Sequence, residues 1–169
     1  MIIRPETAND YGSIRNILIA AFADHPYSHQ TEHLIVDALR ASGALTVSLV
    51  AEIDGSVVGH IAFSPVKING ADCKWFALGP VAVLPGFQRQ GIGRGLIEEG
   101  LKTIRILGAE GCVLVGEPDF YRRFGFHHNP ALVLEGIPPD CFKYFMCLPM
   151  TVQTPEGLVT HHPAFSVGL

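Results

Sequence analysis

The stretch from Val81 to Leu96 constrains the fold of this chain more than any other. An apolar, strand-like run breaks at Pro85-Gly86 and passes through a turn, Gln88-x-x-Gly91-x-Gly93, into a helix. Glycines in such a turn let backbone N–H groups approach a ligand, because no β-carbon stands in the way. The first turn of the helix adds unpaired N–H groups and the positive end of the helix dipole. The pattern predicts a binding site for an anion such as a diphosphate, although the same glycines would also suit a tight turn that binds nothing.

The amino-terminal third of the chain is predicted to be helical. After Thr7, apolar residues recur with the spacing of one helix face, at Ile14, Ile17, Leu18, Ala21 and Phe22. A loop over residues 24–28 follows. A second helix then carries Leu34, Ile35, Ala38 and Leu39 and ends at Gly43.

Three strands with short turns between them are predicted next. Strands over 45–53 and 57–66 are joined by Asp54-Gly55, a dipeptide that favours a hairpin, and Asn69-Gly70 leads into a strand over 74–83. After a helix over 91–107, Cys112 to Val115 should form a strand parallel to 74–83, because a helix crosses over between them. The remaining predictions are a short helix from Pro118 through Phe124 and two strands within 126–134 and 143–149, with no element assigned after Thr151. The fold class is therefore α/β (α+β), with a mixed, mostly antiparallel sheet, a central parallel pair and flanking helices.

Two other nucleotide-binding folds are disfavoured by this pattern. The dinucleotide fingerprint needs a third glycine where Leu96 stands, and it belongs to a parallel sheet wound by successive crossover helices. Here an antiparallel meander precedes a single strand-helix-strand unit. A P-loop is excluded because no Gly-Lys-Ser/Thr follows the glycines.

Composition is that of a single globular domain, expected to span residues 1–169. The chain has 169 residues, of which 48% are hydrophobic and 17% charged, enough to bury a large core. Its net charge of -4 without a long charged run favours neither nucleic acid nor an anionic membrane as partner, and suits a cationic or neutral substrate. Neither a secretory signal nor a membrane span is visible, so a cytoplasmic protein is expected. The cysteines lack CxxC spacing and are expected to be reduced.

Two motifs, in this order, resemble those of the GNAT superfamily of N-acetyltransferases. Val81-x-Val83 followed by Gln88-x-x-Gly91-Ile92-Gly93 is similar to its acyl-CoA-binding motif, and Phe120-Tyr121-x-x-x-Gly125-Phe126 to its second motif. The segment from Gly116 to Phe126, with His162-Pro163-Ala164-Phe165, looks like a bacterial subgroup of predicted acetyltransferases. The resemblance covers residues from about 2 to about 150 and implies a GNAT-like form of the predicted fold.

The resemblance also implies roles for particular residues. The main chain of Val81 and Val83 would bond the pantetheine arm of acetyl-CoA. The pyrophosphate would be held by the turn after Gln88, through the backbone N–H groups of Arg89, Gln90, Gly91, Ile92, Gly93 and Arg94. Tyr121 aligns with the tyrosine that protonates the leaving thiolate, and a phenol suits that task because it stays protonated at neutral pH. Many relatives have Asn and Ala where this chain has Leu114 and Glu117.

No residue stands out as the base that an attacking amine requires. Glu117, four residues before Tyr121, is the favoured candidate, and Glu52, His60 or ordered water are the alternatives. His127-His128 and His161-His162 are not expected to bind metal, because adjacent residues on a strand point to opposite faces.

The predicted function is transfer of an acyl group, with acetyl expected, from acetyl-CoA to a small-molecule or peptide amine. The amine would attack directly within a ternary complex. The alternative is a catalytically silent acyl-CoA-binding module that acts as a sensor or partner subunit. The loop over 24–30, the hairpin and the carboxyl-terminal strands are expected to choose the acceptor, and the sequence is compatible with a homodimer without deciding the oligomeric state.

Overall fold

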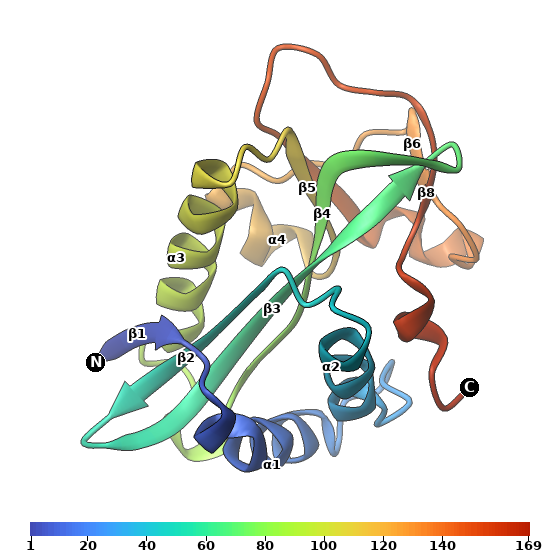
Figure 1. Cartoon of the computed structure of the whole chain (residues 1–169). Coiled ribbons are helices and arrows are strands. Elements are labelled where there is room, and N and C mark those ends of the chain that lie inside the picture. Colours follow the sequence, from blue (N-terminus) through green and yellow to red (C-terminus); the bar gives the residue numbers. More distant parts are fainter.

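The protein folds around an eight-stranded mixed sheet with helices on both faces (Figure 1). The structure is a computed structural model that describes all residues, 1–169. β4 and β5 run parallel in the middle of the sheet, whereas β1–β2, β2–β3, β3–β4 and β5–β7 are antiparallel pairs. β8 pairs with β3, and the short β6 pairs with β8 in parallel. The predicted mixed, mostly antiparallel sheet with a central parallel pair is confirmed. The strands are β1 (Ile2–Pro5), β2 (Val47–Ile53), β3 (Ser56–Ile68), β4 (Ala71–Val83), β5 (Gly111–Val115), β6 (Leu132–Leu134), β7 (Phe145–Pro149) and β8 (Gly157–Thr160).

Both predicted hairpins are present. Asp54 and Gly55 have φ values of 49° and 81°, and Asn69 and Gly70 have φ values of 54° and 76°. Left-handed backbone at both central residues of a two-residue turn matches the twist of the strands it joins. These turns therefore fix the antiparallel meander of β2, β3 and β4.

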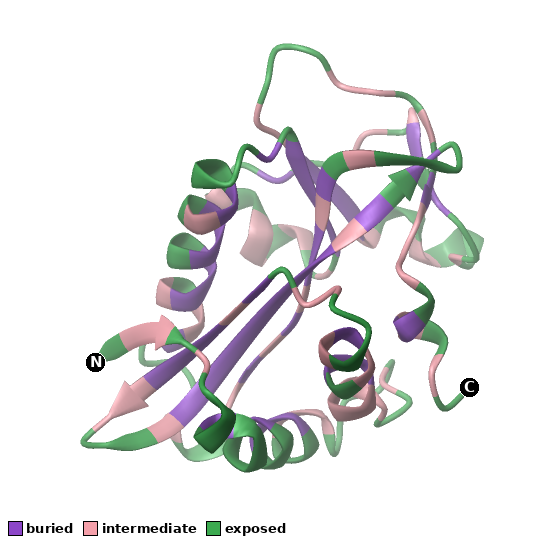
Figure 2. Ribbon diagram, viewed as in Figure 1, coloured by how far each residue is buried: buried purple, intermediate pink, exposed green.

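The helices bury alternate residues of the same strands. α3 (Ile92–Ile106) packs on one face, where Leu49 of β2 lies in the main core, and α1 (Tyr11–Phe22) packs on the other, against Val50. Successive residues of a strand point to opposite faces, so β2 contributes to both cores. Figure 2 shows the buried stripe of α3 turned toward the sheet. α2 (Glu32–Ala41) packs beside α1, and none of the helices has the length and apolarity to span a bilayer.

Some elements differ from the sequence-based expectation. β1 was not predicted, and it pairs along the edge of β2, with Ile3 opposite Ala51. β8 lies in the tail to which no element was assigned. Each of these strands has four residues, too few for a periodic pattern, and each forms by pairing with a distant segment. The predicted helix from Pro118 is α4 (Pro118–Tyr121), followed by a 3-10 turn and Gly125 at φ 96°. The 3-10 turns cover Ala8–Asp10, Pro85–Phe87, Arg122–Phe124, Pro139–Tyr144 and Pro163–Ser166.

Candidate active site

A cleft opens where the central parallel strands separate. β4 and β5 pair from Trp75 opposite Gly111 to Ala77 opposite Val113, and β4 then continues through Gly79 and Pro80 without β5, while β3 pairs with it on its other edge. Gly79 has a φ of 147° and Pro80 has no N–H to donate, so neither continues regular pairing. A cleft of about 890 Å³ lies beside this stretch. It is lined by residues 78–83 of β4, by residues 114–117 at and after the end of β5, and by two side chains of α4.

The main chain of Val81 and Val83 faces this cleft. The N–H of Leu84 donates to the carbonyl of Val58 on β3 at 2.9 Å. Hydrogen-bonded positions alternate along an antiparallel pair, so Val81 and Val83 direct their N–H and C=O groups away from β3. The side-chain amide of Gln88 donates to the Val83 carbonyl at 3.0 Å, from the side away from β3. The outward backbone groups of Val81 and Val83 therefore line the cleft where β5 no longer pairs, and the Val83 carbonyl among them is covered by Gln88.

The glycine-rich turn lies at the Val83 end of the cleft. Arg89 and Gly91 have φ values of 63° and 83°, and α3 begins directly after Gly91. The first bond of the helix runs from the N–H of Gly95 to the carbonyl of Gly91, which leaves the N–H groups of residues 92–94 without helical partners. A β-carbon at Gly93 would stand 3.8 Å from Cγ2 of Val83. This geometry has the features of an anion site at a helix N-terminus.

The side chains of the turn contribute less than its backbone. Arg94 pairs with Glu98 on the exposed face of α3 at 2.9 Å. Arg89 and Gln90 are exposed, and Gln88 is the member of the turn that lines the cleft. The main chain, and not the side chains, therefore gives this turn the geometry of an anion site.

Tyr121 faces the cleft from the opposite wall. Its ring packs edge-on against Phe120 and Phe126, with centroids 4.9 and 6.1 Å away. Burial, assisted by the nearby Cys112, raises the pKa of Tyr121 to about 12. The phenol therefore keeps its proton throughout the neutral range and can serve as a proton donor.

Glu117 stands at the mouth of the same cleft. It is exposed, and its carbonyl accepts the N–H of Tyr121 at 3.1 Å, so the two residues lie one helical turn apart. The structure thus brings Glu117 and Tyr121 together with Val81, Val83 and Gln88 around one space.

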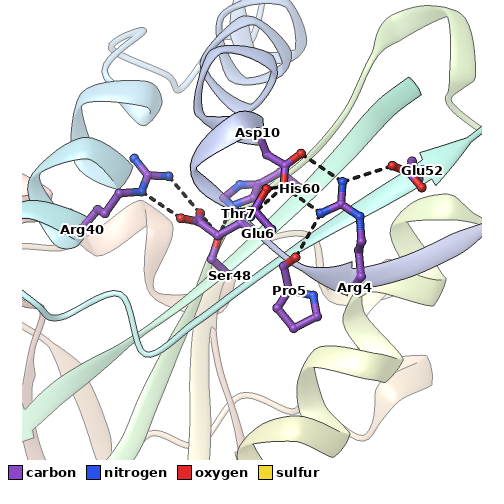
Figure 3. A network of polar contacts seen from close by, with 9 residues as sticks. All are labelled: Arg4, Pro5, Glu6, Thr7, Asp10, Arg40, Ser48, Glu52 and His60. Carbon is purple, nitrogen blue, oxygen red and sulfur yellow. Dashed lines mark hydrogen bonds and ion pairs between the residues drawn. The ribbon is translucent and has the colours of Figure 1, made fainter. Parts of the chain in front are cut away.

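Glu52 and His60 lie elsewhere, in the polar network of Figure 3. Glu52 pairs with Arg4 at 3.1 Å, and Arg4 also holds Asp10 at 2.7 Å. His60 is fully buried, with Nε2 2.8 Å from the hydroxyl of Ser48. Neither candidate base lines the cleft, and burial lowers the pKa of His60 to about 4. The alternation of side chains along a strand shows which residues share a face of the sheet, but it does not predict on which face the cleft lies.

The same network joins the amino terminus to α2. The Ser48 hydroxyl donates to the carboxylate of Glu6, and Arg40 donates to both oxygens of Glu6 at 2.9 Å. His60 is therefore the inner end of a chain of polar contacts that ties α2 to the sheet.

The members of the two histidine pairs, His127-His128 and His161-His162, have different surroundings. His161 lines the cleft, while Nδ1 of His162 accepts the N–H of Ala164 at 3.1 Å. Nδ1 of His128 lies 3.1 Å from the carbonyl of Phe145. No cluster of three or more His, Cys, Asp or Glu side chains is placed to hold a metal ion.

Further side chains complete the cleft, and the sequence assigned none of them individually to a site. They come from the end of α1, the loop after it, α2, the 3-10 turn at 139–144 and the tail. The loop was expected to choose the acceptor, but the tail had no pattern that pointed to a site. These side chains are Phe22, His25, Tyr27, Ser28, His29, Glu32, Cys141, Tyr144, His161 and Phe165.

Comparison with known proteins identifies the family. A family model described as an acetyltransferase (GNAT) domain matches residues 45–128. The protein named Uncharacterized N-acetyltransferase YhbS, from Escherichia coli (strain K12), is 34% identical over 171 residues, which cover 98% of this chain and 99% of that protein. The chain belongs to the GNAT family of acetyltransferases.

Solved structures of GNAT proteins have the same fold as this one. A GNAT family acetyltransferase from Brucella melitensis, in complex with acetyl-CoA, is 51% identical, with a TM-score of 0.86 and coverage of 97% of each chain. YhbS from Escherichia coli, in complex with CoA, is 32% identical, with a TM-score of 0.88 and coverage of 99% of this chain and 92% of that one. The matched domain of this GNAT acetyltransferase includes the turn and Tyr121, whereas α1, α2 and the tail lie outside it.

Proposed function

We propose that this protein transfers an acetyl group from acetyl-CoA to an amine by direct attack within a ternary complex. One arrangement carries the proposal: the backbone groups of Val81 and Val83 that face away from β3 lead directly to the glycine-rich turn, with Tyr121 also lining the cleft. The relatives from Brucella melitensis and Escherichia coli, solved with acetyl-CoA and CoA, support a coenzyme A ligand in this fold.

The cofactor would be held mainly by main chain. The N–H groups of Ile92, Gly93 and Arg94, at the positive end of α3, would bind the pyrophosphate. The amides of the pantetheine arm would hydrogen-bond the outward groups of Val81 and Val83 like an added strand. This places the thioester beside β4, in the part of the cleft that Tyr121 lines.

The chemistry then needs one acid and one base. The ammonium loses one proton to become a free amine, which attacks the acetyl carbon, so that a C–N bond forms as the C–S bond breaks. The nitrogen then releases its second proton to solvent and becomes a neutral amide. The sulfur leaves with the electron pair of that bond and takes the proton of the Tyr121 phenol, giving free CoA. Solvent then restores the proton of Tyr121.

Glu117 is the base we assign to the amine. Its carboxylate lies at the mouth of the cleft, one helical turn from Tyr121, and its exposure lets it pass the proton to water. Glu52 and His60 are tied into the network with Arg4 and Ser48, which supports leaving the role with Glu117.

Initial-rate kinetics test the proposed mechanism. Varying acetyl-CoA at several amine concentrations should give intersecting double-reciprocal lines, as direct attack in a ternary complex requires. Parallel lines would indicate an acetyl-enzyme, and Cys141 is the thiol that lines the cleft. Mass spectrometry of protein incubated with acetyl-CoA alone should therefore find Cys141 unmodified, and acetylation of Cys141 at the rate of turnover would contradict direct attack.

A further inference from the structure

Part of the cleft lies beyond the groups assigned to the cofactor. Its walls come from the end of α1, the loop after it, the start of α2, the 3-10 turn at 139–144 and the tail after β8. The tail packs on α2, and in Figure 1 these segments lie across the sheet from α3, whose amino terminus carries the glycine-rich turn. We call this region the acceptor half and define it by Phe22, Tyr27, Glu32, Tyr144, His161 and Phe165.

The wall of the acceptor half is largely aromatic. The ring of His161 stacks on Phe165, with centroids 4.2 Å apart and planes inclined by 23°. Burial lowers the pKa of His161 to about 4, so the ring is neutral at physiological pH. A neutral imidazole presents a flat face together with a nitrogen that can accept a hydrogen bond. Phe22 and Tyr144 add aromatic rings to the lining of the same cleft, so this wall suits a planar or aliphatic body.

The charged side chains that line the cleft are carboxylates. They are Glu32 and Glu117, while His25 and His29 lie at exposed positions of the rim. The hydroxyl of Ser28 lies 2.7 and 2.8 Å from the two oxygens of Glu32, which holds that carboxylate at the start of α2. Such a lining attracts an ammonium group and repels a carboxylate or a phosphate.

We propose that the acceptor is a primary amine on a compact aromatic or apolar body that carries no acidic group. This inference rests on the proposed acyl transfer and names its substrate class. The body packs against the stack of His161 and Phe165, and Glu32 favours an ammonium over a zwitterion. An amino acid would bring a carboxylate into a lining that is already negative, where it loses water without gaining a cationic partner.

The test compares phenethylamine with phenylalanine, which differ by one carboxylate. With acetyl-CoA saturating, kcat/KM for phenethylamine should exceed that for phenylalanine by about tenfold or more. Propylamine, which keeps the amine but lacks the ring, should have a higher KM than phenethylamine.

Variants assign these preferences to residues. Glu32→Gln should raise the KM for phenethylamine. It should also lower the ratio of kcat/KM for phenethylamine to kcat/KM for phenylalanine, because no carboxylate at position 32 then repels the carboxylate of phenylalanine. Phe165→Leu should reduce the difference in KM between propylamine and phenethylamine, because the aromatic ring loses its packing partner. Glu99→Gln, on the exposed face of α3, makes the same change of charge outside the cleft and should leave the ratio and the difference in KM as they were.

The outcomes separate this inference from the function beneath it. Thiol release with phenylalanine equal to that with phenethylamine would overturn the substrate class and leave acyl transfer standing. Calorimetric binding of phenethylamine, but not phenylalanine, to CoA-loaded protein without any thiol release would support the substrate class and remove the proposed function. If phenethylamine neither binds to the protein nor becomes acetylated, the inference is overturned.

Discussion

The ring of Tyr121 occupies the space beside Gly116 that a side chain at position 116 would need. A β-carbon there would overlap with Cε2 of the ring. Gly116 follows β5 directly and lines the same cleft, so its missing side chain sets how closely Tyr121 approaches the backbone of the cleft wall.

Gly116→Ala should therefore displace the phenol. We expect kcat to fall by roughly tenfold, because a proton donor moved by about an ångström loses its alignment, while acetyl-CoA affinity changes little. Steady-state kinetics and calorimetry measure the two quantities. Gly12→Ala on α1 is the matched control, since a β-carbon there meets nothing within 4 Å. Unchanged turnover in Gly116→Ala would mean that the position of Tyr121 does not matter to the reaction.

Tyr121→Phe keeps the ring and removes the proton. Turnover should fall by roughly 10² or more, because general acid catalysis contributes about that factor. Since the pKa of Tyr121 is raised to about 12, the parent enzyme should lose no activity from ionisation of this phenol below pH 10. Stopped-flow detection of thiol release measures the step. A Tyr121→Phe enzyme with the parent's turnover would reduce Tyr121 to a packing residue.

Gly93→Val tests the anion site. A β-carbon at this position is in ordinary contact with Val83, so the fold should tolerate the change. The added methyl groups would crowd the N–H groups at the start of α3. Acetyl-CoA affinity should weaken by more than tenfold, which is about 1.4 kcal/mol. Calorimetry gives the affinity and a melting curve confirms folding. Wild-type affinity in a folded Gly93→Val protein would place the pyrophosphate elsewhere.

Glu117→Gln removes a base while preserving shape. The rate at neutral pH should fall, and it should recover at high pH, where the free amine is abundant without help. Acetyl-CoA affinity should stay near the parent's. The comparison of the two pH–rate profiles from pH 6 to 10 decides the matter. Superimposable profiles would transfer the role from Glu117 to ordered water.

The buried histidines predict how stability depends on pH. The pKa of His60 is about 4 in the folded protein and about 6.5 when unfolded. Between these values the unfolded chain binds a proton that the folded chain does not, so the free energy of unfolding falls as pH drops from about 6.5 to 4. The full difference is roughly 3 kcal/mol for His60. His161 contributes in the same direction, whereas Asp10, with a pKa of about 2, loses its contribution at lower pH.

Urea unfolding at pH 7.5 and pH 5 measures this dependence. His60→Gln can keep a hydrogen bond to Ser48 but does not titrate, so its stability should fall less between the two pH values than the parent's. An equal fall in parent and variant would show that His60 is not the group responsible.

The fold was predictable where local chemistry decides it. Asp54-Gly55 and Asn69-Gly70 are dipeptides that strongly favour the left-handed backbone of a two-residue hairpin turn, and both adopt it here, so these turns could be predicted from local sequence. β1 and β8 could not be predicted, because a strand of four residues is too short to show an alternating hydrophobic pattern. Their pairing partners, β2 and β3, also lie far away along the chain.

Some residues of the candidate site could likewise be predicted from the sequence, and others could not. Val81, Val83 and the turn after Gln88 belong to one continuous motif that the sequence shows, and Val81, Val83 and Gln88 line the cleft. His161 and Phe165 come from a tail without pattern, and the pairing of β8 with β3 and the packing of the tail on α2 bring them to the cleft. His60 shows the converse limit, because a histidine on a central strand was a reasonable candidate base until its burial behind Ser48 was known.

Release of free CoA when an amine is added tests the central claim most directly. Protein loaded with acetyl-CoA is mixed with phenethylamine, and free thiol and N-acetylated product are quantified together. The account predicts that thiol and product appear one for one, with the rate falling by roughly 10² in Tyr121→Phe. Tight binding of acetyl-CoA with no amine-dependent thiol, across a broad panel of amines, would contradict it and make the protein a silent acyl-CoA-binding module.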